Sequence, residues 1–185
     1  MKTPAVCIAF VALLASSSYA QKPLAHPDLS GRWQLAESPG LLRGGPLVVT
    51  QDATTVTIEM EPAGNGSPST TIYRVPGETR RDNTAAPPTP SSPTAMTARL
   101  LQIVSHAGWM ADRLVIVSHT TYRVHWPTEV ANDFDHEFVS RETYALDPKG
   151  QLIVERTTIM DPLPFSVMIR PDFVPVDGTR TYKKQ

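Results

Sequence analysis

The chain has 185 residues, and its 17 basic and 18 acidic side chains leave a formal net charge of −1. A nearly neutral chain has no excess positive charge for binding nucleic acid or an anionic membrane surface, so the composition argues against both partners. The single cysteine, Cys7, excludes an internal disulfide, and a chain of this length can bury a sufficient core without one.

The first 20 residues have the pattern of a secretory signal peptide. Lys2 is their only charge, an apolar stretch runs from Val6 to Ala15, and Ser18-Tyr19-Ala20 offers the small residues that a signal peptidase requires. This apolar stretch is shorter than the about 20 residues of a membrane-spanning helix, which disfavours the alternative of a retained anchor. We expect cleavage before Gln21, export to the periplasm or the extracellular medium, no membrane span afterwards, and one domain over residues 21–185.

Beyond this segment, apolar and polar residues alternate with a period of two, which predicts β-strands along most of the chain. Val56, Ile58 and Met60, for example, alternate with threonine and glutamate. The stretch Asp147-Pro148-Lys149-Gly150 is typical of a hairpin turn, because proline sets φ near −65° and glycine accepts a positive φ. The predicted strands are 31–36, 47–51, 54–60, 70–75, 97–108, 113–124, 134–146, 151–159 and 179–183.

Short strands joined by hairpins predict an all-β fold, a closed antiparallel meander barrel of 8–9 strands, because closure removes exposed strand edges. Residues 83–96 contain four prolines among small and polar residues, a composition that predicts a flexible Pro-rich loop. Further prolines within residues 161–175 exclude a long helix there.

The first predicted strand carries a recognisable motif. Gly31-Arg32-Trp33 resembles the G-x-W motif of the lipocalins and the wider calycin group, and Ser30 to Leu35 is similar to the opening strand of uncharacterised exported bacterial lipocalin-like domains. The resemblance implies a barrel closed by Gly31 and Trp33, with Arg180 of the last strand packed over the indole. It implies no particular ligand, because the T-D-Y signature of lipocalins is replaced by Asn132-Asp133-Phe134. The alternative is that Trp33 is simply a core aromatic residue.

If the apolar face of each strand points into the barrel, several polar side chains point inward as well. A barrel of this size is either filled by side chains or holds one small ligand. Pairing across the Pro148 turn sets Glu142 directly against Arg156. Two interpretations are open: the polar end of a mostly apolar pocket, or a solvated rim pair that contributes under about 1 kcal/mol. The candidate ligand-binding residues are Ser118, Thr120, Tyr122, His136, Phe138, Glu142, Tyr144 and Arg156.

The histidines and carboxylates do not predict a metal site or a cofactor. His136-Glu137 begins like the zinc motif H-E-x-x-H, but Ser140 occupies its last position, and the segment is expected to be a strand. No pair shows the tight spacing that is typical of zinc ligands. We expect solvated or hydrogen-bonded structural histidines. The residues considered are His106, His119, His125, His136, Asp133, Asp135 and Glu137.

Known catalytic motifs are equally lacking from the sequence. It contains no G-x-S-x-G motif, no phosphate-binding glycine loop and no cysteine beyond the signal segment. The carboxylates of residues 133, 135 and 137 suit sugar chemistry but are more often a soluble strand face. A sugar-stacking surface of Trp109, Trp126 and Tyr122 is weighed against packing at the barrel ends. We predict no catalytic residue.

Three functional interpretations remain. The first is an exported lipocalin-like barrel that binds a small apolar or amphipathic molecule. The second is a non-catalytic structural or protein-interaction module with a filled core and an unknown protein partner, and the third is a secreted enzyme that acts on a small molecule or sugar. A cavity of about 300 Å³ or more favours the first over the second.

Overall fold

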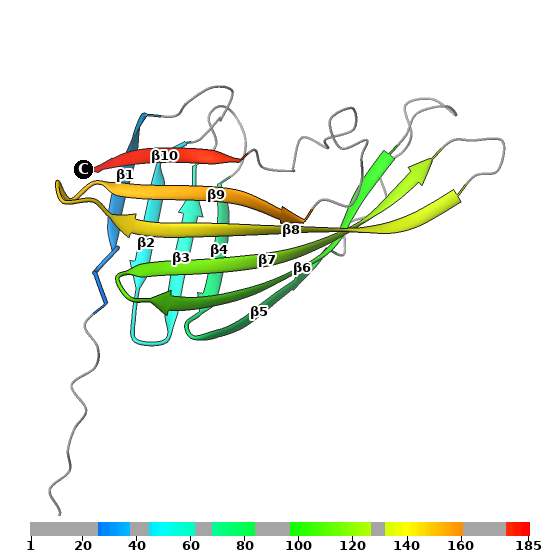
Figure 1. Cartoon of the computed structure of the whole chain (residues 1–185), viewed down its shortest axis with the longest axis horizontal. Coiled ribbons are helices and arrows are strands. Elements are labelled where there is room, and N and C mark those ends of the chain that lie inside the picture. The colour runs from blue at the N-terminus through cyan, green and yellow to red at the C-terminus, as the bar shows by residue number, and fades with distance from the viewer. Residues whose placement is uncertain (1–25, 38–44, 62–67, 84–96, 127–131, 161–176) are drawn as a thin grey trace, which may run out of the picture.

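The computed structural model describes residues 26–37, 45–61, 68–83, 97–126, 132–160 and 177–185 (Figure 1). The predicted signal peptide, nearly all of the Pro-rich loop and the stretch at 161–175 therefore lie outside the described residues. The strands are β1 (Gly31–Glu37), β2 (Leu47–Gln51), β3 (Thr55–Met60), β4 (Ser69–Arg74), β5 (Gly77–Asp82), β6 (Thr97–Met110), β7 (Arg113–Trp126), β8 (Asn132–Leu146), β9 (Leu152–Met160) and β10 (Gly178–Lys184).

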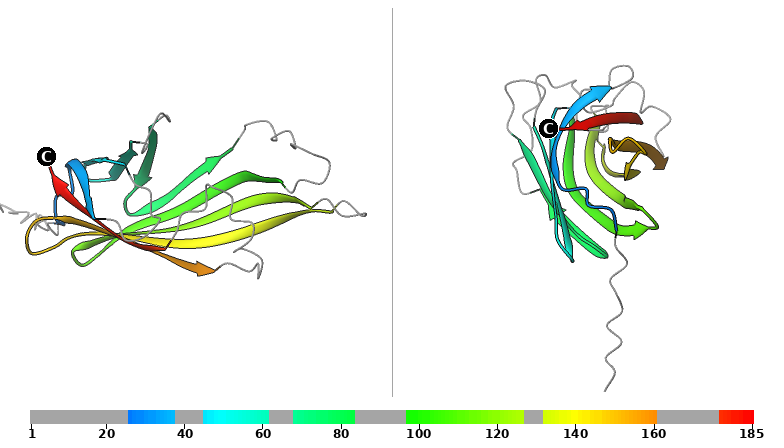
Figure 2. Two further views of the ribbon diagram at one scale, coloured as in Figure 1. Left: turned by 90° about the horizontal axis from the view of Figure 1, so that it is seen from above. Right: turned by 90° about the vertical axis from the view of Figure 1, so that its left-hand side faces the viewer.

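All ten strands belong to one antiparallel sheet, in the order β4-β3-β2-β1-β10-β9-β8-β7-β6-β5. The first and last strands of the described chain pair with each other, with Trp33 opposite Lys184 and Leu35 opposite Tyr182. The sheet curls round so that its outer strands, β4 and β5, approach each other (Figure 2). The fold is therefore an all-β meander that forms a nearly closed barrel.

Between β4 and β5 the barrel is not sealed by a backbone ladder, and we call this gap the seam. Side chains link its two sides. The Arg74 backbone N–H donates to Thr79 Oγ1 at 3.0 Å, and Arg81 Nη1 donates to Thr71 Oγ1 over a long 3.4 Å. The predicted full closure was thus wrong at this one place.

The prediction also gave 8–9 strands where the structure has ten, because β5 was missed. Its sequence, Gly-Glu-Thr-Arg-Arg-Asp, contains no apolar side chain, so it shows none of the alternation that identifies a buried strand. It is held instead by its ladder with β6, which runs from Gly77 opposite Ala107 to Asp82 opposite Gln102.

One end of the barrel is filled by a compact apolar core. The indole of Trp33 is buried in it and donates from Nε1 to the Leu29 carbonyl at 3.0 Å. Because the core gathers at this end, the other part of the interior is left for the cavity described below. The buried core residues are Leu29, Trp33, Leu47, Val49, Val56, Ile58, Val75, Ala107, Leu114, Ile116, Tyr144, Leu152, Val154 and Tyr182.

The cation over the Trp33 ring is Lys184, whose Nζ lies 5.5 Å from the ring centroid. Gly31 lies beneath the same lysine: its φ is +146°, and a Cβ there would lie 2.7 Å from Lys184 Cε. Arg180 is buried farther back on β10, opposite Val154, and beside Tyr182. The structure thus shows Lys184 over the Trp33 ring, and the role that the resemblance implies for Arg180 stays a prediction.

Replacing Trp33 by alanine should lower the free energy of unfolding by about 3–5 kcal/mol, because the change removes a large buried side chain and leaves a cavity. Urea unfolding measures the loss. Ile72→Ala on β4 is the control, since Ile72 is 56% exposed and its truncation should change stability by no more than about 0.5 kcal/mol. Equal effects of the two changes would contradict the core assignment.

Candidate functional site

The barrel encloses a cavity of about 430 Å³ next to the packed core. Strands β3 to β9 all contribute to its wall, so it reaches from one side of the seam to the other. Its lining residues are Ile58, Met60, Ser69, Thr71, Tyr73, Thr79, Arg81, Leu100, Ile103, Ser105, Ser118, Thr120, Phe138, Glu142, Tyr144 and Arg156.

Most of the side chains predicted to point inward lie on this wall. The structure brings together Ser118, Thr120, Phe138, Glu142, Tyr144 and Arg156. The other two candidates, Tyr122 and His136, are buried outside the lining, where their rings meet edge to face with centroids 4.7 Å apart. The inward alternation of β7 and β8 therefore identified cavity residues but not where along each strand the cavity ends.

Sequence reasoning missed the side chains that β4 and β5 contribute. Ser69, Thr71 and Tyr73 follow the strand alternation of β4, and this signal would have placed them on one face. Thr79 and Arg81 gave no such signal, because β5 carries no apolar residue from which an inner face can be assigned.

The charged centre of the cavity is an ion pair between β8 and β9. Glu142 and Arg156 stand directly opposite each other, and Arg156 Nη1 donates to Glu142 Oε1 at 2.5 Å. Their side chains are only 15% and 11% exposed. Of the two interpretations open from the sequence, the structure shows the largely buried pair, which is tolerated when its charges are compensated.

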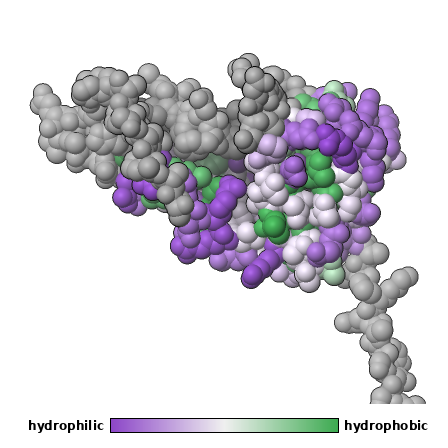
Figure 3. Space-filling view, turned by 180° about the vertical axis from the view of Figure 1, so that it is seen from behind, coloured by the Kyte–Doolittle hydropathy of each residue, from purple (hydrophilic) through white to green (hydrophobic). Residues whose placement is uncertain are grey.

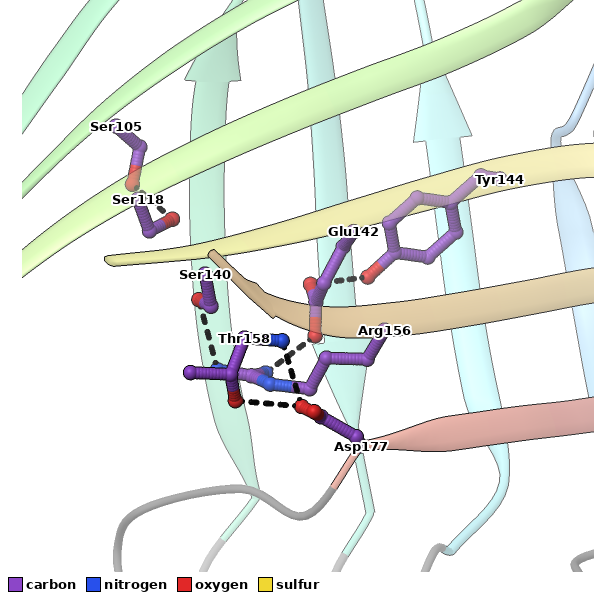
Figure 4. Close-up of polar contacts among 8 residues, drawn as sticks. All are labelled: Ser105, Ser118, Ser140, Glu142, Tyr144, Arg156, Thr158 and Asp177. Carbon is purple, nitrogen blue, oxygen red and sulfur yellow. Dashed lines mark hydrogen bonds and ion pairs between the residues drawn. The ribbon is translucent and has the colours of Figure 1, made fainter. Parts of the chain in front are cut away.

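Neighbouring hydroxyl groups form hydrogen bonds with this pair (Figure 4), although Arg156 Nε is buried without a partner among the described residues. Tyr144 donates its hydroxyl proton to Glu142 Oε2 at 2.9 Å, and Arg156 Nη2 donates to Ser140 Oγ at 3.0 Å. Both oxygens of the carboxylate are therefore engaged within the protein. In the same region, the Asp177 carboxylate accepts hydrogen bonds from the backbone and side chain of Thr158, at 2.7 and 2.6 Å, which fixes the start of β10 against β9.

Two tyrosines of the cavity wall have raised pKa values. Burial raises the pKa of Tyr144 well above its usual 10.0, and the negative charge of Glu142 adds to the effect. Burial and then Glu142 raise the pKa of Tyr73 to about 12, while Arg81 acts in the opposite direction. Both phenols therefore stay protonated at neutral pH, as hydrogen-bonding groups and not as bases or nucleophiles.

Four of the residues considered as metal ligands are exposed on β6 to β8, namely His106, His119, Asp135 and Glu137, whereas His136 is buried. His119 Nδ1 lies 2.7 Å from Glu137 Oε1, and Arg123 forms an exposed pair with Asp135. Within the described ranges, no three histidine, cysteine or acidic side chains gather as a metal site. Figure 3 shows the opposite side of the molecule from Figure 1, where the described surface mixes hydrophilic and intermediate residues with a few hydrophobic ones. The side chains of His125 and Asp133 lie outside the described set.

The proposed aromatic surface is not assembled by the described residues. Trp109 packs at the edge of the core and stacks on His26, with ring centroids 4.7 Å apart and planes at 5°. Tyr122 is buried between strands, and the side chain of Trp126 is not described. These placements favour packing over sugar stacking for the two residues that are described.

Comparison with protein-family models finds no match, and comparison with curated proteins finds none either. Within the described part of the chain, no helix is long and apolar enough to cross a membrane.

Replacing Arg156 by alanine should lower the free energy of unfolding by about 3 kcal/mol, because Glu142 would be left largely buried without its cation. The double variant Glu142→Leu/Arg156→Met should recover most of that loss. As a control, Arg123→Ala removes a pair whose side chains are 51% and 49% exposed, and should lose no more than about 1 kcal/mol. Urea unfolding measures these losses. If Arg156→Ala lowers the free energy of unfolding as little as the control does, the Glu142–Arg156 pair is solvated.

Tyr73 should make the protein less stable at alkaline pH. Its folded pKa of about 12 exceeds the usual 10.0, so above pH 10 the unfolded chain binds fewer protons and the free energy of unfolding falls as pH rises. Below pH 10 the residue adds no such slope. Tyr73→Phe should flatten the decline in urea-unfolding series across this range, whereas an identical slope in the variant would show that Tyr73 ionises normally.

Proposed function

We propose that the protein is a lipocalin-like binding protein that holds one small amphipathic molecule inside its barrel. The observation that carries this proposal is the cavity of about 430 Å³. Ligand pockets in proteins measure about 300–1,000 Å³, so the space suits a small organic molecule. A scaffold with a filled core, the second interpretation from the sequence, would have no use for this space.

The chemistry of the wall supports an amphipathic ligand over a purely apolar one. Apolar side chains from β3, β6 and β8 share the cavity lining with hydroxyl groups and the Glu142–Arg156 pair. A ligand that buries an apolar part and directs a polar group to these hydroxyls would leave few buried groups unpaired. The apolar lining residues are Ile58, Met60, Leu100, Ile103 and Phe138.

The same wall favours binding over catalysis. A general base needs an available acceptor, yet both oxygens of Glu142 already accept hydrogen bonds from Tyr144 and Arg156. The raised pKa of Tyr73 keeps that phenol protonated. These features suit a site that binds a molecule without reacting with it. Of the three interpretations, they therefore support the secreted enzyme least.

Export belongs to this proposal as well. It is supported by the charge at Lys2, the apolar stretch after it and the small residues before Gln21. We therefore propose a periplasmic or extracellular binding protein.

The test uses the full chain and a neutral fluorescent naphthylamine probe that brightens in apolar surroundings, displaced by decan-1-ol. Thr120 lines the cavity and Thr121 follows it on the other face of β7, so Thr120→Trp and Thr121→Trp form a matched pair. Thr120→Trp should weaken probe binding by about tenfold or more, since an indole fills much of the space, whereas Thr121→Trp should bind as the wild type does.

Two results would contradict the proposal: no saturable probe binding by the wild-type protein, or equal binding by the two variants. Urea unfolding of both variants separates lost binding from lost folding. Native mass spectrometry of protein purified from its own host then looks for a small molecule that travels with it.

A further inference from the structure

The charges that line the cavity do not cancel. Three charged side chains contribute to the wall, namely Arg81, Glu142 and Arg156. Glu142 and Arg156 neutralise each other in a direct ion pair. The guanidinium of Arg81 is the positive charge that is left over.

Arg81 differs from its neighbour on β5 in what it contacts. Arg80, on the outward face, pairs with Asp82, which also accepts a hydrogen bond from Gln102. Arg81 turns to the cavity, and the hydrogen bond it makes there is the long one to Thr71 Oγ1, at 3.4 Å. Among the described residues, no carboxylate pairs with it. A guanidinium with this freedom can present two parallel N–H groups to an oxyanion.

The surroundings of Arg81 suit the polar end of an amphiphile. The hydroxyls of Thr71 and Thr79 lie on the same cavity wall, on the two sides of the seam. Apolar side chains begin directly beside them, because Ile103 stands opposite Arg81 and Ile58 stands opposite Thr71 in the strand register. An anionic group at Arg81 would therefore have hydroxyls around it and an apolar wall next to it.

The seam also gives a charged group a place that is not fully desolvated. Since β4 and β5 form no backbone ladder, the wall is interrupted where Arg81 lies, and Arg81 itself is exposed. A charge bound here keeps part of its hydration, which lowers the free-energy cost of taking an anion from water.

We infer that the ligand is an anionic amphiphile whose oxyanion group, a carboxylate or a sulfate, binds Arg81 at the seam while its apolar part lies against Ile103 and Phe138. This inference rests on the proposed function, since it names the class of ligand for the same cavity. It goes further by assigning the anion to a residue on β5.

Competition experiments with one alkyl length test it. Decanoate, decyl sulfate, decan-1-ol and decylamine each displace the neutral naphthylamine probe from the wild type, Arg81→Gln and Arg80→Gln. At least one of the anions should bind the wild type about tenfold tighter than the alcohol, as expected for a charged hydrogen bond, and decylamine should bind more weakly than the alcohol. If only one of the two anions binds more tightly than the alcohol, that anion shows whether the ligand carries a carboxylate or a sulfate.

Arg81→Gln should remove the preference for the anion over decan-1-ol, whereas Arg80→Gln should keep this preference, because the Arg80 side chain faces outward. Arg81→Lys should keep part of the preference, since lysine retains the charge without the planar fork. Added salt should weaken anion binding to the wild type and leave alcohol binding unaffected.

The outcomes separate the two proposals. Equal affinity of wild type for the anions and the alcohol, or a preference that persists in Arg81→Gln, would overturn the inference and leave the binding function intact. Failure of every probe to bind the wild type would overturn both. Unfolding curves of the variants confirm that a lost preference does not reflect a lost fold.

Discussion

The whole architecture depends on the ladder between β1 and β10. These strands are the first and last of the described chain, and their pairing from Trp33 to Glu37 turns a meander into a barrel. Without this ladder the sheet would have β1 and β10 as open edges, and the inward faces would have no opposite wall to pack against. The packed core at one end and the cavity beyond it both exist because this contact brings the opposite halves of the sheet together.

The interior of the barrel is packed at one end and contains the cavity farther along its axis. At the end closed by Trp33, apolar side chains and the buried Arg180 fill the space. Farther along the barrel, serine, threonine and tyrosine side chains and the Glu142–Arg156 pair line a cavity together with apolar ones. A largely buried ion pair contributes little net stability even when its hydrogen bonds are complete. Its position on the cavity wall supports the proposed binding function.

Sequence patterns predicted the parts of this structure that local chemistry dictates. The Asp147–Gly150 turn sets the register of β8 and β9, so the sequence alone places Glu142 opposite Arg156. The limits of the cavity could not be predicted, because Tyr122 and His136 obey the same alternation as Glu142 and yet pack against each other. The cation above Trp33 likewise depends on the β1–β10 register, which puts Lys184 opposite Trp33.

The least predictable strand is also the one that gives the barrel its distinctive feature. Glu78, Arg80, Arg81 and Asp82 make β5 nearly all charged, which hides it from any search for apolar alternation. Charged side chains are the means by which natural sheets keep an edge from pairing with other chains. The same composition therefore explains why alternation did not reveal β5, and it fits the position of this strand at the edge of the sheet. We propose that the protein uses this edge as the polar side of its binding site.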